Sequence, residues 1–408
     1  MNKDIYIIGI GMGNLSCLTE RAKTLLEEAE LIIGATRMIK EIQAWHSHFP
    51  EFIIEYFPDK IVGQIQQSEK KRIVVAMSGD SGFYSGAKKL FIELEKAGIP
   101  VQIEPGISSL SYFASRLKLP WEDIKIVSLH GNTENLSAIL RKHEKVFAIT
   151  QGQTEEICKE LTEAGFGDIS LYVGKRLSYP EEEIIKTTPR TYKEKEKEPL
   201  TVLLFIREKE ERFITAGIPD NVFIRGNTPM TKSEIRAIIL SKLAVKETDI
   251  IYDIGAGTGS VSVELAIAAY RGKVYAVECQ KEALFLIQEN KKRFGCSNLE
   301  IIPGMAPEAI EGLLPADIVF IGGTKGNLLF ILKQIIHQKH NVRIAISAVT
   351  LETISEVFSN MEQLGIQIID ASQIAVTKLE KVGNYHMMRA QNPIFLVIGQ
   401  YSCPDKTK

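Results

Sequence analysis

The sequence predicts an α/β protein built as two consecutive domains, and three observations carry that prediction. A chain of 408 residues exceeds what one hydrophobic core usually organises. Short β-branched runs alternate with stretches of helical spacing, which favours largely parallel sheets covered by helices. A charged segment interrupts this alternation near the middle of the chain. We therefore expect domains at 1–208 and 217–408, joined by a linker at 209–216.

In the first domain a strand is expected at 5–8, followed by a glycine turn and a helix over 18–29. Further buried strands are predicted at 73–77, 101–104, 124–129, 146–150, 169–173 and 200–206. The alternating charges of 193–198 indicate a solvated hairpin loop.

The alternation restarts in the second domain, which we expect to be a doubly wound α/β unit. Helices are predicted at 232–243, 261–270 and 281–294, and strands at 250–254, 273–277, 299–302, 317–321, 343–347, 367–372 and 393–399. The segment from Ile206 to Gly217 is charged and lacks an apolar pattern, so the two halves should be separable.

Composition excludes several classes of protein. A net charge of -2 gives no global field for RNA or DNA, so a nucleic-acid partner is not expected. Five scattered cysteines without a CxxC pair fit free thiols in a reducing cytoplasm. The His46 and His48 pair has no third ligand nearby in sequence, and we predict no metal site. No run approaches ~18 apolar residues, so no membrane span is predicted.

A glycine turn in the second half lies between a predicted strand and a predicted helix. Glycines there let the backbone approach a ligand closely, and the helix N-terminus offers N–H donors. The sixth position from Gly255 is Ser260, which breaks the dinucleotide fingerprint. The pattern G-x-G-x-G, with Asp253 before it and Glu278 after the next strand, resembles the Rossmann-like S-adenosylmethionine methyltransferases. In that family the two acids lie near the methionine and the ribose, respectively.

The sequences around Thr231 and Ala306 resemble the flanking motifs of the decarboxylating precorrin methyltransferases that act at carbon 15. That resemblance implies that S-adenosyl-L-methionine is bound by Thr231, Gly255, Ala256, Gly257, Thr258, Gly259, Glu278 and Ala306. It also places Gly322 and Gly323 beside the transferred methyl group. One position departs from the family, because Met305 stands where an acidic acceptor for adenine is common.

Three segments of the first half, each after a predicted strand, together resemble the tetrapyrrole methylase family. They are the glycine turn of 9–13, the loop of 76–84 and the turn of 104–110. The resemblance implies a cofactor cleft between two α/β lobes, lined by Gly11, Asp80, Phe83, Ser108 and Ser109. The sequences of 121–123 and 128–131 further resemble the branch that methylates a corrin precursor at carbon 5. His130 is a candidate for steering a substrate carboxylate, with loop capping as its alternative.

Together these resemblances imply an enzyme of cobalamin biosynthesis that methylates precorrin-6B, or its cobalt form, at carbons 5 and 15 and decarboxylates the ring C acetate. The scattered cysteines and the lack of a long apolar run lead us to expect it in the cytoplasm. No cofactor beyond S-adenosyl-L-methionine is expected. The alternatives are an RNA methyltransferase and a tetrapyrrole-binding protein without catalysis. The family also implies a homo-oligomer, in the second unit commonly a tetramer.

The substrate carries many carboxylates, so we expect cations in each cleft. The catalytic candidates are His130, Lys232, Arg236, Gly322 and Gly323. Further candidate cations are Arg116, Lys175, Arg176, Lys325, Lys381, His386 and Arg389.

Overall fold

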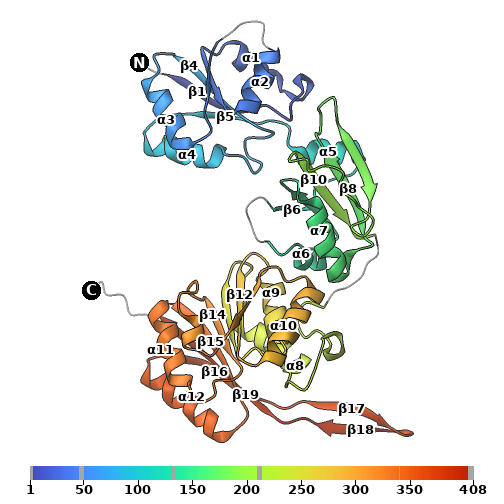
Figure 1. The fold of residues 1–408 in the computed structure, drawn as a ribbon. Helices are drawn as coiled ribbons and strands as arrows, with labels where there is room; N and C mark the ends of the chain where they lie inside the picture. The colour runs from blue at the N-terminus through green and yellow to red at the C-terminus, as the bar shows by residue number, and fades with distance from the viewer. Residues whose placement is uncertain (1–2, 46–49, 130–133, 209–213, 340, 403–408) are drawn as a thin grey trace.

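A computed structural model describes residues 3–45, 50–129, 134–208, 214–339 and 341–402. Within these ranges the chain forms two five-stranded sheets, one seven-stranded sheet and a two-stranded hairpin. Figure 1 shows three successive units along the chain, coloured blue, green and yellow to red. We call residues 1–208 the first half, with a first and a second lobe, and residues 217–408 the second half.

The first lobe is a parallel sheet in the order β3-β2-β4-β1-β5. Its strands are β1 (Asp4–Gly9), β2 (Leu31–Gly34), β3 (Glu51–Ile54), β4 (Arg72–Met77) and β5 (Gln102–Glu104). Its helices are α1 (Glu20–Glu27), α2 (Thr36–Trp45), α3 (Pro58–Gln67) and α4 (Ala87–Lys96). We did not predict β2 and β3, because four residues are too few to display a strand period.

The second lobe has the strand order β6-β7-β10-β8-β9, and here the expected parallel sheet is wrong. Only β6 and β7 pair in parallel, whereas the other pairs are antiparallel. Parallel neighbours need a crossover connection, and no helix lies between β8 and β10 to provide one. The charged run 193–198 is the loop from β9 to β10, which do not pair, so it is not a hairpin loop.

The strands of this lobe are β6 (Lys125–Ser128), β7 (Lys145–Ile149), β8 (Ser170–Lys175), β9 (Glu183–Thr187) and β10 (Thr201–Ile206). Its helices are α5 (Ser109–Leu117), α6 (Leu136–Lys142) and α7 (Thr154–Leu161). A short π-helix, η2 (Thr162–Phe166), continues α7.

The second half is the expected doubly wound unit, with strand order β13-β12-β11-β14-β15-β19-β16. Its strands are β11 (Ile250–Ile254), β12 (Lys273–Glu278), β13 (Leu299–Pro303), β14 (Ile318–Ile321), β15 (Asn341–Ala348), β16 (Gln367–Ile374) and β19 (Ile394–Ser402). The helices are α8 (Ser233–Leu243), α9 (Ser260–Ala268), α10 (Lys281–Phe294), α11 (Leu328–Gln338) and α12 (Leu351–Gln363). The strand order reverses between β11 and β14, where such sheets open a crevice at their carboxyl ends.

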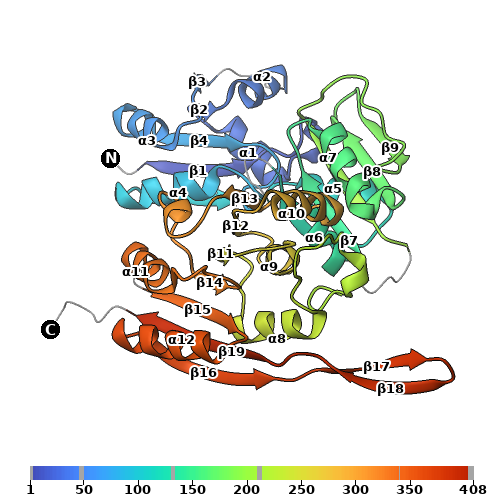
Figure 2. The same ribbon diagram turned by 60° about the horizontal axis from the view of Figure 1, so that its bottom comes forward.

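A hairpin that the sequence did not predict extends from this sheet. Its strands are β17 (Thr377–Val382) and β18 (Tyr385–Ala390), and Figure 2 shows it projecting beyond the helices. Every residue of β18 is exposed, including Tyr385, Met387 and Met388. A strand pair without a buried face need not alternate apolar and polar residues. The sequence therefore contains no signal by which this hairpin could be predicted.

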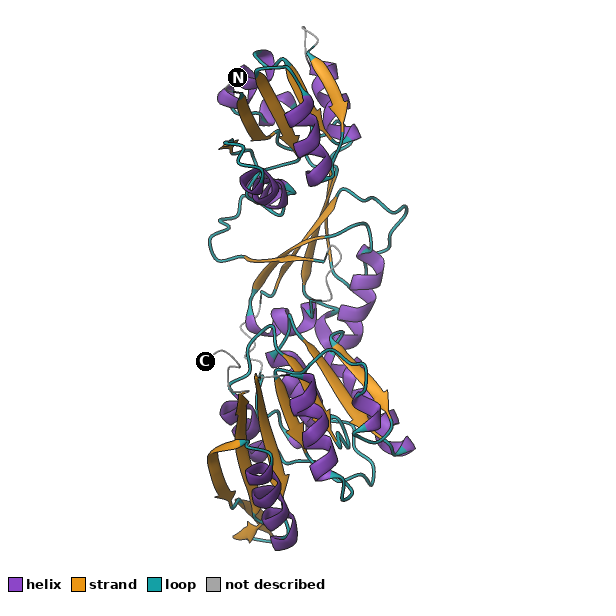
Figure 3. Ribbon diagram, turned by 90° about the vertical axis from the view of Figure 1, so that its left-hand side faces the viewer, coloured by secondary structure: helices purple, strands orange, loops and turns teal. Residues whose placement is uncertain are grey.

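The two halves share an apolar interface, which corrects the expectation that nothing holds them together. Phe166 of the second lobe and Phe294 of α10 belong to one buried cluster. The Arg141 guanidinium carbon lies 5.3 Å from the Phe166 ring centre and 5.4 Å from that of Phe294. The fully buried Asn135 donates from Nδ2 to Asn298 Oδ1 at 2.9 Å. The side view of Figure 3 shows the second lobe and the second half in direct succession.

Within the described part of the chain, no helix has the length and apolar character that crossing a bilayer requires.

Candidate cofactor-binding sites

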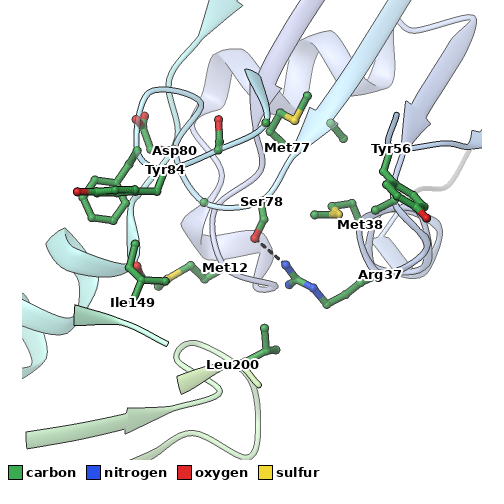
Figure 4. A pocket seen from close by; sticks show the side chains of 18 of the residues that line it. Met12, Arg37, Met38, Tyr56, Met77, Ser78, Asp80, Tyr84, Ile149 and Leu200 are labelled. Atoms are coloured by element: carbon green, nitrogen blue, oxygen red, sulfur yellow. Dashed lines mark hydrogen bonds between the residues drawn. The ribbon is translucent and has the colours of Figure 1, made fainter. Parts of the chain in front are cut away.

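The first half has a cleft of about 400 Å³ between its two lobes. Figure 4 shows its walls, with Met12, Arg37 and Ser78 from the first lobe facing Ile149 and Leu200 from the second. The loop that follows β4 lines the cleft as well, with Asp80 and Tyr84. The cleft therefore takes residues from all parts of the first half, as expected for a ligand site between lobes.

Three loops of the first half contact one another through glycine backbones, and one of these glycines, Gly79, lines the cleft. Gly11 and Gly79 exchange two backbone hydrogen bonds, of 3.0 and 2.6 Å. A Cβ on Gly106 would lie 2.3 Å from the Gly79 carbonyl oxygen and 2.6 Å from that of Gly9. No side chain fits there, so the motif glycines are explained by contact between backbones.

Asp80 connects two of these loops. Its carboxylate accepts from the Gly82 N–H at 2.8 Å and from the Gly106 N–H at 2.9 Å. Asp80 also lines the cleft, so it combines a loop-fixing role with access to a ligand.

The other predicted cofactor residues of the first half divide into two groups. Phe83 and Ser109 line the cleft together with Asp80. Ser108 instead caps α5, where its hydroxyl accepts from the Ser111 N–H at 3.1 Å, and it is absent from the lining. Gly11 is also absent from the lining and shapes the turn. We conclude that these two residues support the site without facing it.

The second half has a pocket of about 410 Å³ at the carboxyl ends of β11 and β14. Most of the residues predicted for this half line it: Thr231, Gly255, Ala256, Gly257, Thr258, Glu278, Ala306, Gly322 and Gly323. Gly259 does not, because it faces α10, where a Cβ would lie 3.1 Å from the Ile287 side chain.

The glycine turn of this pocket has the conformation that glycine permits. Gly255 and Gly257 have φ of 76° and 58°, and a Cβ on Gly255 would lie 2.8 Å from the Gly323 carbonyl oxygen. The Glu278 carboxylate accepts from the backbone N–H groups of Gly257, Cys279 and Gln280, at 3.0, 2.7 and 2.9 Å. These bonds hold the carboxylate at the end of β12, on the wall of the pocket.

Two polar side chains of the pocket have buried atoms without a partner in the described structure. They are Asp253 Oδ1 and Thr258 Oγ1. The other oxygen of Asp253 accepts from the Ser262 hydroxyl. Burial of Asp253 raises the pKa of its carboxyl to about 7, and the nearby Glu278 adds to this. An unsatisfied buried acid beside a cavity fits a site for a cationic ligand group.

Met305 is 42% exposed and lines the same pocket. Its side chain therefore faces the cavity and does not fill the core. Lys325 also lines the pocket, and its Nζ lies 3.0 Å from Cys279 Sγ. Of the predicted cations of this half, Lys325 alone is placed at the pocket by the described structure.

Arg236 is not a substrate cation, which corrects our expectation. Its side chain is 0% exposed, and its Nε donates to Glu264 at 2.7 Å. The remaining bonds go to Asp220 and to the carbonyl groups of Thr231 and Ile218. A buried arginine saturated in this way fixes the segment before α8 and has no group directed at the pocket. Lys232 is likewise outside the lining, with Nζ 4.0 Å from Asp220.

The remaining predicted cations are not at the pockets either. Lys381, His386 and Arg389 are on the projecting hairpin, where Arg389 pairs with Glu380 at 2.9 Å. In the first half Arg116 pairs with Glu182 and Arg176 with Glu198, and neither they nor Lys175 line the cleft. His130 lies outside the described residues, as do His46 and His48.

Two polar residues of the first cleft, Arg37 and Tyr179, were not among the residues predicted from the sequence. Neither belongs to a glycine motif, and no spacing connects α2 to the segment after β8. Across the part of the chain that the structure describes, no group of three His, Cys, Asp or Glu side chains is placed to hold a metal ion.

Two parts of the chain match models of known protein families. One matching family model describes tetrapyrrole (corrin/porphyrin) methylases and covers residues 4–192, and another describes a precorrin methyltransferase domain and covers residues 219–400. A relative from Pyrobaculum calidifontis, named as a probable cobalt-precorrin-6B C(15)-methyltransferase (decarboxylating), is 37% identical over 45% of this chain and 96% of its own.

A relative from Sinorhizobium sp, named as a decarboxylating precorrin-6Y C(5,15)-methyltransferase, is 27% identical over 90% of this chain and 89% of its own. A crystal structure titled as a precorrin-6Y C5,15-methyltransferase from Geobacter metallireducens shares 31% identity, covers 47% of this chain and 100% of its own, and has a TM-score of 0.45.

Proposed function

We propose that this chain, which belongs to the decarboxylating precorrin methyltransferases, methylates a corrin precursor at carbons 5 and 15 and removes the ring C acetate carboxyl group. Residues 1–208 would act at carbon 5, and residues 217–408 at carbon 15 together with the decarboxylation. The observation that carries the proposal is the presence of two separate pockets, each lined by its own set of motif residues.

The residues of the second pocket fit S-adenosylmethionine. The unpartnered oxygen of Asp253 would receive the ammonium of the methionine, and Glu278 would accept from the ribose hydroxyls. Met305 would lie against the adenine. Gly322 and Gly323 carry no side chain that would obstruct a bulky carbon nucleophile at the end of β14.

When bound, the cofactor supplies a methyl group that is electrophilic because it is attached to a sulfonium. The reduced macrocycle has enamine-like carbons whose electron pair forms the new bond, while the sulfur keeps the pair of the bond that breaks. The protein therefore needs to align two reactants, and such alignment contributes about 7–11 kcal/mol in favourable cases. Loss of carbon dioxide leaves an electron pair that the conjugated macrocycle accepts, so no covalent catalyst is required.

The first cleft offers the same chemistry with other groups. Asp80 lies on the loop after β4, Ser109 begins α5, and the ring centre of Phe83 is 6.2 Å from that of Phe147. These residues would hold the cofactor between the lobes and leave the remaining cleft to the macrocycle.

The decisive experiment is an assay of the purified chain with S-adenosylmethionine and either precorrin-6B or its cobalt form. The expected product has gained two methyl groups and lost carbon dioxide, as read by mass spectrometry. Comparison of the two substrates also tells whether the physiological one contains cobalt. Absence of methyl transfer to both would contradict the proposal.

We also infer that the chain forms a homo-oligomer through the β17–β18 hairpin, with a tetramer as the expected state. The hairpin exposes Leu379, Tyr385 and Met388 at 63%, 78% and 69%, which is unusual for apolar side chains on a free surface. Sedimentation of a Leu379→Glu, Met388→Glu variant should show a smaller species than the unchanged chain.

A further inference from the structure

The cleft of the first half contains one cationic side chain among its described lining residues, Arg37 of α2. We propose that Arg37 binds a peripheral carboxylate of the tetrapyrrole and so determines which substrate this cleft accepts. This inference rests on the proposed function of the first half and extends it to a residue outside the motifs.

The guanidinium of Arg37 is fixed before any ligand arrives. Its Nη2 donates to Ser78 Oγ at 2.6 Å, and its Nη1 donates to Glu41 Oε1 at 3.1 Å and to the Tyr179 hydroxyl. Figure 4 shows the side chain extended along the cleft toward Ser78. Arginine presents a rigid planar set of donors that matches a carboxylate, and little side-chain entropy remains to be lost on binding.

Tyr179 holds this arrangement from the opposite lobe. Its ring occupies a notch at Gly13, where a Cβ would lie 2.2 Å from the ring carbon Cζ. The neighbouring Ser178 hydroxyl donates to the Met12 carbonyl oxygen at 2.6 Å. Burial and the bond to Glu41 raise the pKa of Tyr179 to about 12, so the phenol keeps its proton and donates to Glu41.

The surroundings make a cation at this place effective. Met12, Met38, Met77 and Tyr56 line the same cleft, and most of its surface is apolar, although the carboxyl groups of Glu55 and Asp80 line it as well. A charged hydrogen bond is stronger where water is displaced by such a surface. The Arg37 side chain remains 34% exposed, which leaves part of it accessible to a ligand. Among the described residues, its guanidinium makes three hydrogen bonds of the five that it can donate.

A competing explanation is that Arg37 only joins the lobes through Tyr179. Three variants of the full chain distinguish the two explanations. Arg37→Gln removes the positive charge. Tyr179→Phe removes the hydroxyl that bonds to Arg37 and Glu41 but keeps the cation. Arg37→Lys keeps a positive charge but lacks the planar set of guanidinium donors. Arg116→Gln is the matched control, because Arg116 is an exposed arginine on α5 of the first half and does not line the cleft.

The measurement is kcat and KM for methylation at carbon 5, with methylation at carbon 15 by the same molecules as the internal reference. We expect Arg37→Gln to raise KM for the tetrapyrrole roughly ten- to a hundredfold with kcat changed less than about threefold. Arg37→Lys should recover part of the loss. Added salt should raise KM in the unchanged chain and much less in Arg37→Gln, which a purely structural role would not produce.

Equal increases of KM in Arg37→Gln and Tyr179→Phe, without a difference in salt dependence, would overturn the proposal. So would an unchanged KM in Arg37→Gln. If Arg37→Gln melts at a lower temperature, the comparison passes to Arg37→Lys, for which a KM above that of Arg116→Gln is expected and an equal KM contradicts the inference. Failure of the unchanged chain to methylate carbon 5 would instead reject the function proposed for the first half.

Discussion

The two pockets of this chain are held in place by different kinds of contact. In the first half, glycine backbones of three loops touch one another, and the pocket lies between two separate sheets. In the second half, the pocket lies at the carboxyl ends of the strands of one sheet, and its glycine turn is fixed by the Glu278 carboxylate. The first pocket is therefore shaped by two lobes, and the second by the end of a single sheet.

This difference bears on how each pocket responds to its surroundings. A pocket between lobes depends on the contacts that join them, such as Tyr179 against Gly13. Ligand binding in the second pocket depends on two buried carboxyl groups, because Asp253 is fully enclosed and Glu278 nearly so. Conformational changes should affect the first pocket more, and pH the second.

The largest expected effect is the loss of ligand binding at one pocket when a glycine of that pocket is replaced by valine. The unchanged chain should bind two equivalents of S-adenosylhomocysteine in a calorimetric titration. Gly255→Val should remove the second site, because its Cβ would lie 2.8 Å from a carbonyl oxygen, and Gly106→Val the first, where that distance is 2.3 Å. We expect a loss of affinity on the order of a hundredfold or more at the altered site and none at the other. A single site in the unchanged chain would refute two functional pockets.

The interface between the halves tests whether the two pockets belong to one rigid body. Asn135→Ala removes both the cap of α6 and the buried bond to Asn298. We expect the free energy of unfolding to fall by about 2–4 kcal/mol in denaturant titrations. Thr350→Ala, which removes only the cap of α12, should cost about 1 kcal/mol. Equal losses in the two variants would show that the bond across the interface contributes nothing.

The same interface sharpens the question of separability. Residues 217–408 alone would expose Phe294 and Tyr270, which are buried in the full chain. We expect this fragment to unfold at lower denaturant concentration than the same region within the full chain. Identical unfolding midpoints would restore the view that the halves are independent.

Charge in the second pocket predicts a pH effect that the first should lack. Because the pKa of Asp253 is raised to about 7, its carboxyl loses its proton as the pH rises toward 7. The ammonium of the cofactor favours the ionised form, so affinity at this site should increase roughly tenfold between about pH 5.5 and 7. Calorimetry on Gly106→Val isolates this site, and Gly255→Val isolates the first for comparison. An equal increase in affinity at both sites would mean that the pH dependence comes from titration of the ligand and not from Asp253.

Folding stability should change in the opposite sense through the same group. A group whose pKa is higher in the folded than in the unfolded state stabilises the fold at a pH below its unfolded pKa. That stabilisation is lost as the pH rises to its folded pKa. Without cofactor, the Asp253 contribution should therefore decline between about pH 4 and 7. Asp253→Asn should remove this dependence, and an unchanged pH profile in that variant would assign it to other groups.

The smallest expected effect concerns Met305, which is 42% exposed at the pocket. Met305→Asp would supply an acidic acceptor for the adenine amino group. Since water competes at a half-exposed position, we expect cofactor affinity to rise about three- to tenfold with an unchanged melting temperature. A lower melting temperature without a gain in affinity would mean that the Met305 side chain matters for packing.

The local features of this protein were predictable from its sequence. A turn with positive φ, as at Gly255 and Gly257, is indicated by the glycines themselves, and a strand is indicated by its own β-branched residues. The predicted strands and the doubly wound sheet of the second half are accordingly present. The Glu278 position could be found because it is at the carboxyl end of its strand, the next strand after the glycine turn.

Only the tertiary structure decided which charged and apolar side chains are buried. Arg236 is enclosed because Glu264 and Ile218 reach it from other segments, whereas Arg37 is at a cleft because Tyr179 approaches from 142 positions away. The antiparallel second lobe and the interface at Asn135 depend in the same way on distant partners. Sequence periodicity records the conformation of neighbouring residues, but the environment of a side chain is set by segments that meet only after folding.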